Sequence, residues 1–107
     1  MSRFKGTKGP WEFIDVSESA RHKFAPACII RGSGRQVARF SWGESSPYFP
    51  SEEESKSNAR LIAAAPDLLE ALQRLVKAVN YGTGDELFDA EELAEVAMEK
   101  ALGQQPL

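Results

Sequence analysis

The sequence contains only one cysteine, Cys28, and one histidine, His22, and this scarcity excludes several kinds of site. One cysteine forbids a disulfide within the chain and fits a reducing compartment. A zinc site needs several convergent ligands, and beyond these two side chains only carboxylates are available. His22 lies in a polar loop, Cys28 lies in an apolar segment, and no nucleophile–base pair is recognisable. We therefore expect no catalytic residue, no metal site and no cofactor, and hence no enzyme.

Long apolar runs are also missing. No segment approaches the roughly 20 apolar residues that a membrane-spanning helix requires. The first ten residues are basic, but they lead into Trp11 and Glu12 rather than into an apolar block, so they do not resemble a secretory signal. We expect a cytoplasmic protein with no membrane segment.

What the sequence does contain is enough apolar material for one domain. Hydrophobic residues make up 42% of the 107 residues, which favours a packed core over disorder. We expect a single domain over residues 1–107, with a flexible lead (1–9), a β-meander (10–43) and a helical part (51–102). The last few residues are expected to fray.

The β-meander is predicted from three β-rich segments, Trp11–Val16, Ala27–Arg31 and Arg35–Trp42. The turn Gly32–Gly34 between the last two segments makes the strongest hairpin signal in the chain. Strand alternation places Ala38, Phe40 and Trp42 on one face of the last strand, and Val37, Arg39 and Ser41 on the other. We expect the first of these faces to lie against the long helical stripe described next.

A long amphipathic stripe follows a clear helix start. Ser51 and Glu54 form a capping-box pattern, with acidic residues in the first turn. The apolar positions that follow are spaced by three and four residues, as on one face of a helix. These positions are Leu61, Ala65, Leu68, Leu72, Leu75 and Val79.

Pro66 interrupts this stripe. An interior proline removes a backbone hydrogen bond and costs about 3 kcal/mol, and it disfavours helical angles at Ala65. Two structures fit the pattern: one kinked helix, or a helix that ends at Ala64 or Ala65 with Pro66 opening the next one. The stripe keeps its phase across Pro66, which favours a kink or a very tight break.

The long helical region is expected to end at Tyr81–Gly84, with Gly82 as a left-handed cap. A last helix should run from about Asp85 or Asp89 to Leu102, and Asp89 with Glu92 is a second candidate capping box. Leu87 and Phe88 would anchor its entry. The buried face would consist of Leu93, Ala94, Ala97 and Ala101.

Because this last face is rich in alanine, the helix needs a partner surface: the sheet, the long helix or another subunit. The resulting fold class is α+β, a small antiparallel β-meander of about three strands packed against a long Pro-kinked helix and a C-terminal helix. A homodimer is a further expectation, because a three-stranded sheet is too small to cover both the long stripe and the weakly apolar final helix.

Two motifs resemble a known family. Gly9-Pro10-Trp11 near the start and the segment Asn58–Leu72, which reads NARLIAAAPDLLEAL, resemble small proteins of tailed phages and prophages, a family of unassigned function. The resemblance covers residues 9–80. It implies a short sheet followed by a helix and a bacterial host, and it transfers no catalytic or binding residue to this chain.

Charge is divided unevenly along the chain. Residues 1–40 carry a formal charge of +5 and residues 41–107 carry −8. The two halves can attract each other within the fold or between subunits, or the basic half can meet an anionic ligand. A mixed, solvated surface is the plainer interpretation.

Two functional hypotheses follow. The first is a non-enzymatic phage accessory protein that binds a host or phage protein, in host takeover or inhibition of host defence. Its interface would use Trp42, Tyr48 and Phe49, unless these aromatics simply close the core. The alternative is a nucleic-acid or anionic-ligand binder that uses a basic hairpin carrying Arg31, Arg35 and Arg39. The turn Gly32–Gly34 could cradle a phosphate, although no phosphate-loop pattern surrounds it and a plain tight turn explains it.

Overall fold

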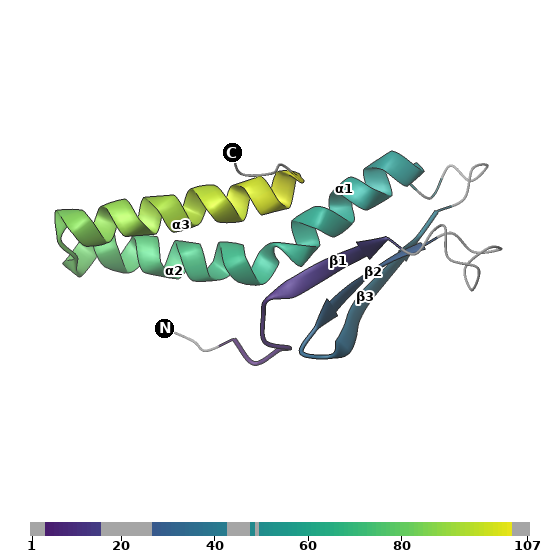
Figure 1. Cartoon of the computed structure of the whole chain (residues 1–107), viewed down its shortest axis with the longest axis horizontal. Helices are drawn as coiled ribbons and strands as arrows, with labels where there is room; N and C mark the ends of the chain where they lie inside the picture. The colour runs from purple at the N-terminus through teal and green to yellow at the C-terminus, as the bar shows by residue number, and fades with distance from the viewer. Residues whose placement is uncertain (1–3, 16–26, 43–47, 49, 104–107) are drawn as a thin grey trace.

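The computed structural model describes residues 4–15, 27–42, 48 and 50–103, which form an α+β domain. Within these residues the strands make one antiparallel sheet in the order β1-β2-β3, followed by the helices (Figure 1). The strands are β1 (Trp11–Asp15), β2 (Ala27–Gly32) and β3 (Arg35–Ser41), and the helices are α1 (Glu52–Ala63), α2 (Ala65–Tyr81) and α3 (Gly84–Leu102). The predicted α+β class is confirmed. The predicted end of the first strand, Val16, lies outside the described residues.

The β2–β3 hairpin has the predicted tight turn. Ser33 and Gly34 have φ values of 51° and 74°, as in the type I′ turns that match the twist of paired strands. A bulge interrupts the ladder, because Ile30 pairs with Ala38 whereas Arg31 pairs with Gln36. The bulge reverses the alternation of β3 on the turn side of Val37.

α1 begins at the predicted cap and covers the sheet. The backbone N–H of Glu54 donates to Ser51 Oγ at 3.2 Å. One face of this helix, made of Ser55, Ala59 and Ala63, is buried. Figure 1 shows α1 lying along the sheet while α2 and α3 run side by side away from it.

Pro66 coincides with a break between two helices. Ala64, at φ −84° and ψ −5°, closes α1 by donating its N–H to the carbonyls of Arg60 and Leu61 at 3.1 and 3.2 Å. α2 then starts with Pro66 in its first turn, where the missing N–H costs no helical hydrogen bond. Of the two structures that the sequence allowed, this is the tight break.

The break changes which helical residues face the sheet. The core contains Cys28 and Ile30 from β2 and Ala59 and Ala63 from α1. Half-buried side chains complete it: Trp11, Phe13, Val37, Ala38, Phe40, Trp42 and Ile62. The prediction that Ala38, Phe40 and Trp42 pack against the Leu61–Val79 stripe was therefore wrong. Small alanines of α1 allow close approach to the sheet, and several stripe residues are exposed, Leu61 by 53% and Val79 by 68%.

α3 ends at Leu102 as predicted and starts at Gly84, next to the earlier of the two predicted starts, Asp85. Its cap is Thr83, whose Oγ1 accepts the N–H of Glu86 at 3.3 Å, so Asp89 lies inside the helix. The left-handed cap is Gly103, at φ 73°, whereas Gly82 is extended at φ −93°. Phe88 does not anchor the entry, because it is 60% exposed.

The predicted alanine face of α3 does pack inward. Ala97 is buried, and Leu93, Ala94 and Ala101 are half-buried. The partner surface is the long helix: α2 and α3 form an antiparallel pair, called here the helical hairpin.

Candidate interaction surfaces

Of the two residues singled out for nucleophile or ligand chemistry, the structure describes only Cys28. His22 lies outside the described residues. Cys28 is fully buried, and burial, followed by the charge of Asp15, raises the pKa of its thiol against the opposing influence of Lys56 and Arg60. A neutral buried thiol is a poor nucleophile and metal ligand. In the described part of the chain, no three His, Cys, Asp or Glu side chains gather as metal ligands would.

No helix among the described residues has the length and apolarity needed to cross a bilayer.

The aromatic residues proposed as an interface occupy different environments. Trp42 is half-buried and packs on the core, with Lys56 Nζ 5.5 Å from its ring centroid. Tyr48 is 90% exposed, and Phe49 lies outside the described residues. Trp42 therefore contributes to the core in addition to any surface role.

Lys56 is fixed above Trp42 by two carboxylates. Its Nζ lies 2.8 Å from Asp15 Oδ2 and 3.0 Å from Glu52 Oε1. The hydrogen bond to Asp15, and then that to Glu52, raises the pKa of Lys56. This cluster ties the start of α1 to the end of β1.

The three hairpin arginines are all exposed, but the strand register does not place them on one face. Arg31 pairs with Glu12, and Arg39 pairs with Ile29, which puts both arginines on the face away from α1. Arg35 pairs with Gly32, which lies opposite Trp11 on the other face. The bulge causes this separation, since regular alternation would align Arg35 with Arg39.

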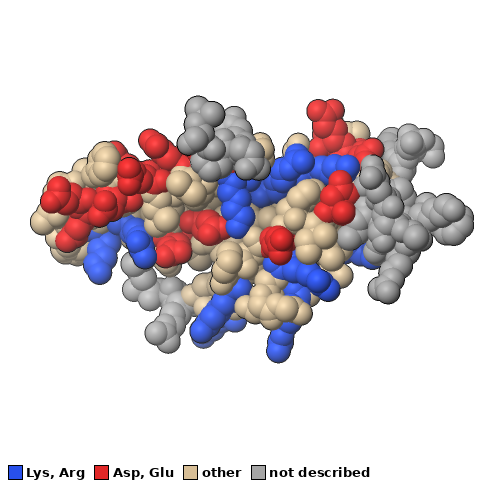
Figure 2. All heavy atoms as spheres, in the orientation of Figure 1, with Lys and Arg blue, Asp and Glu red and all other residues tan. Residues whose placement is uncertain are grey.

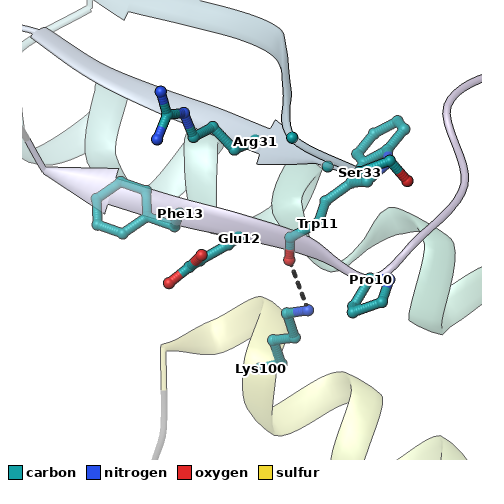
Figure 3. Close-up of a pocket in the computed structure, with 9 residues that line it drawn as sticks. Pro10, Trp11, Glu12, Phe13, Arg31, Ser33 and Lys100 are labelled. Atoms are coloured by element: carbon teal, nitrogen blue, oxygen red, sulfur yellow. Dashed lines mark hydrogen bonds between the residues drawn. The ribbon is translucent and has the colours of Figure 1, made fainter.

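An open hollow lies beside the hairpin turn (Figure 3). The Trp11 ring borders it next to Ser33, and Arg31 lies on the neighbouring strand. A Cβ at Gly32 would come within 2.4 Å of Trp11 Cδ1, so the ring lies directly against the β2 backbone. The hollow thus has one aromatic wall, with the base Arg31 and the acid Glu12 at its border.

Lys100 closes the other side of this hollow and joins distant elements. Its Nζ donates to the Trp11 carbonyl at 2.8 Å and to Asp67 Oδ2 at 2.6 Å. One amine thereby connects β1, α2 and the C-terminal part of α3. Because the amine already donates to these two acceptors, Lys100 is part of the framework and does not offer a vacant positive charge.

The largest aligned set of exposed apolar side chains lies on α2. Residues Leu69, Leu72, Val76 and Val79, spaced by three, four and three, are named here the outer stripe. They are exposed by 39%, 59%, 52% and 68%. Such spacing places all four on one helical face.

A separate row of α2 packs against α3. This inner seam consists of Leu68, Ala71, Leu75 and Ala78, in which the alanines are buried. On α3 the buried Ala90 and Ala97 have the same seven-residue spacing. Small residues in both helices let the backbones approach closely, so the larger side chains of the outer stripe remain outside the contact.

The helical hairpin is strongly acidic on its α3 side. Figure 2 shows acidic side chains gathered over α3, whereas basic groups lie over α1 and along the lower edge of the sheet and of α2. α3 carries the acids Asp85, Glu86, Asp89, Glu91, Glu92, Glu95 and Glu99 against the single base Lys100. Among the described residues, the acidic excess of the second half of the sequence is therefore concentrated on α3, whereas α1 of the same half also carries Lys56 and Arg60.

The outer stripe and the Lys100 contacts were missed from the sequence. Leu72 and Val79 of the outer stripe were predicted as part of one apolar pattern, but that pattern also contained the inner positions Leu68 and Leu75. The inner alanines, spaced by seven, were the signal that separates them.

The described residues define a small α+β protein with a layered sheet and helix at one end and an acidic helical hairpin at the other. Over residues 1–105 the chain matches the family described as Salmonella phage P22 protein Y8K6, and it belongs to that family. It is thus a small phage protein. Neither the curated proteins nor the solved structures contain a match to it.

Proposed function

We propose that this protein is a non-enzymatic phage accessory factor that acts by binding another protein in the cytoplasm of the bacterial host. The observation that carries the proposal is the outer stripe. Exposed apolar residues scattered singly are ordinary on a protein surface, but four in one row along a helix are typical of a contact surface. The family match supports the phage origin.

The stripe suits a particular kind of recognition. A helix whose exposed apolar residues recur at three- and four-residue intervals can dock side by side with another helix or lie in a groove. The hairpin partner α3 holds α2 in place, so little ordering entropy would be lost on binding. A host or phage protein bound here would serve host takeover or the inhibition of a host defence.

Native mass spectrometry of tagged protein, purified gently from a host lysate, tests the proposal. We expect a heterologous protein in stoichiometric complex with the chain, and its loss in Leu72→Glu. Leu72 is 59% exposed, so this change leaves the fold intact. The matched control is Phe88→Glu on α3, which is 60% exposed and outside the stripe. Capture that is absent, or equal for both variants, contradicts a stripe-mediated function.

A second candidate, binding of an anionic ligand or nucleic acid, is favoured by the hollow at the hairpin turn. Arg31 and the Trp11 ring border this hollow together with Glu12, and a guanidinium near an aromatic ring suits a phosphate or an exposed base. The separation of Arg35 from Arg31 and Arg39 reduces the basic surface available on either face.

Binding of a single-stranded oligonucleotide, measured over a range of salt concentrations, tests this candidate. Its support would be a steep salt dependence that Arg31→Glu abolishes. Arg74→Glu, a charge change of the same size on the helical hairpin, should leave binding unaltered. Salt-insensitive or undetectable binding removes the candidate.

A further inference from the structure

The outer stripe has a size gradient along α2. Its two leucines, Leu69 and Leu72, occupy the N-terminal half, and its two valines, Val76 and Val79, occupy the C-terminal half. An antiparallel copy of the same helix, related by a two-fold axis at the level of residue 74, brings Leu69 opposite Val79 and Leu72 opposite Val76. Both pairs are centred on that one residue, so a single symmetry operation satisfies both.

We propose that two copies of this chain pair through the outer stripe, with their α2 helices antiparallel. The proposal rests on the proposed protein-binding function of this stripe and names a second copy as its occupant, so that a host or phage protein would bind there in competition with the second copy. Each large side chain then faces a smaller one, which keeps the spacing between the helices even. A two-fold contact uses the same patch on both subunits, and this patch is complementary to itself.

Charge placement also favours a second copy. At 100° per residue, the charged residues Glu70, Arg74 and Lys77 point at least about 120° away from the centre of the stripe. Glu70 and Arg74 pair with each other at 3.2 Å. The neutral Gln73 and Asn80 flank the stripe, so no like charges meet across it.

The acidic α3 helices explain why α2 rather than α3 would form the contact. Each outer-stripe position follows an inner-seam position by one residue, so α3 lies about 100° around α2 from the contact, beside the paired α2 helices. A contact made through α3 would instead bring two strongly acidic helices together, which like-charge repulsion opposes.

The size of the contact predicts a weak dimer. α2 has 17 residues and is about 25 Å long, so one helix–helix strip buries on the order of 500 Å² per copy. Specific stable interfaces bury about 800 Å² per partner. We therefore expect association at micromolar rather than nanomolar concentration.

Sedimentation equilibrium over the micromolar range tests the proposal with a matched pair of variants. Val76→Glu, at a stripe position exposed by 52%, should weaken dimerisation at least about a hundredfold, because both copies place a carboxylate in the apolar contact. Val96→Glu on α3, exposed by 56%, should leave the dimer intact. A monomer at high micromolar concentration, or equal effects of the two variants, overturns the proposal.

Disulfide trapping tests the antiparallel geometry. Leu69→Cys and Val79→Cys should cross-link to each other when the two variants are mixed under mild oxidation. Neither should cross-link alone, because the like positions are ten residues apart along the dimer axis, about 15 Å, and disulfides need Cα atoms within about 7 Å. Native Cys28 is fully buried and does not compete. Cross-linking of each variant alone would mean a parallel pair and would overturn the antiparallel arrangement.

The two hypotheses fail in different ways. A monomeric protein that still captures a host or phage partner through Leu72 contradicts the dimer alone. A dimer that loses association in Val76→Glu but captures no heterologous protein contradicts the accessory-factor proposal alone.

Discussion

Gly32 shows how tightly single residues are fitted in the sheet. Gly32 is buried, and the Trp11 ring packs against its backbone. The Nε1 of this ring donates to the Thr7 carbonyl at 3.0 Å. Any side chain at this position must displace the ring, since a Cβ would lie 2.4 Å from Trp11 Cδ1. The packing of the hairpin end therefore depends on a glycine for space, whereas the turn depends on Gly34 for its positive φ.

Gly32→Ala should destabilise the protein by about 1–3 kcal/mol, the usual cost of overpacking. The control is Gly84→Ala in the first turn of α3, where a Cβ meets nothing within 4 Å. That change should be neutral or stabilising by up to about 1 kcal/mol. Urea unfolding followed by tryptophan fluorescence measures both, and equal losses would contradict the close packing of Trp11 on Gly32.

Alkaline pH should weaken the fold through Cys28 and Lys56. The pKa of each group is raised in the folded state, by burial first for Cys28 and by the hydrogen bond to Asp15 first for Lys56. A group whose pKa is higher in the folded than in the unfolded protein stabilises the fold fully at pH values below its unfolded pKa. This stabilisation is lost as the pH rises from the unfolded pKa through the folded pKa. Unfolded thiols ionise near pH 8.5 and lysines near pH 10.4.

We therefore expect the urea midpoint to fall from about pH 8.5 upward, with a further decline above about pH 10.4. Cys28→Ala should lower stability at neutral pH by leaving a small cavity, and it should flatten the first part of the decline. A curve with the same slope in both proteins would show that the thiol does not contribute.

At the scale of elements, the helix ends show what local sequence does and does not reveal. Ser51 caps α1 as predicted. Thr83 caps α3 in place of Asp89, and Thr83 with Glu86 matches the capping-box pattern that the prediction overlooked. Thr83 and Asp89 both fit the residue preferences of an N-cap. The connection between α2 and α3 is short, and α3 begins directly after the first of them.

Thr83→Ala should therefore cost about 1 kcal/mol, the typical value for a lost N-cap. Asp89→Ala, which removes the rejected cap residue from the helix surface, should change stability by less than about 0.5 kcal/mol. Thermal or urea unfolding of the two variants gives the comparison. A larger loss for Asp89 would place the true start of α3 further along the chain.

The class, the strands and the hairpin turn could be predicted because their signals are local. β-rich segments, Gly34 and the Ser51 cap each specify the structure of their own neighbourhood. The partner of each helical face could not be predicted in the same way. Leucine spacing suggested one stripe, but the conformation of Ala64 directs α1 to the sheet and α2 to α3, and buried alanines form both contacts.

The candidate surfaces were harder to predict, since they depend on tertiary register. A one-residue bulge beside Ile30 separates Arg35 from Arg31 and Arg39, and no residue pattern marks it. The Lys100 contact with the Trp11 carbonyl spans 89 positions. The exposure of the outer stripe also depends on tertiary structure, because it follows from the packing of the inner seam of α2 against α3.

At the scale of the whole molecule, the structure is elongated, with principal extents of 53, 29 and 26 Å. The largest fully buried side chains among the described residues, Ile30 and Cys28, lie in the sheet. The helical hairpin is joined mainly by small alanines. The sheet and the hairpin should therefore open with different free energies.

Hydrogen exchange should show this difference. We expect the slowest amides in β2 and faster exchange near the α2–α3 connection, around Tyr81–Thr83. Raising the protein concentration should slow exchange along α2 in the wild type but not in Val76→Glu, while β2 remains unchanged. Uniform slowing over all elements would indicate association by another surface.

Ala64 has a consequence for how such a protein can diversify. It is the only residue between α1 and α2, so the side chains that cover the sheet and those that line the hairpin belong to separate helices. A substitution on the outer stripe requires no compensating change around Gly32 and Trp11. During evolution, a phage lineage can therefore change the exposed outer stripe while inheriting the sheet unaltered, provided that Lys100 keeps α3 bound to β1.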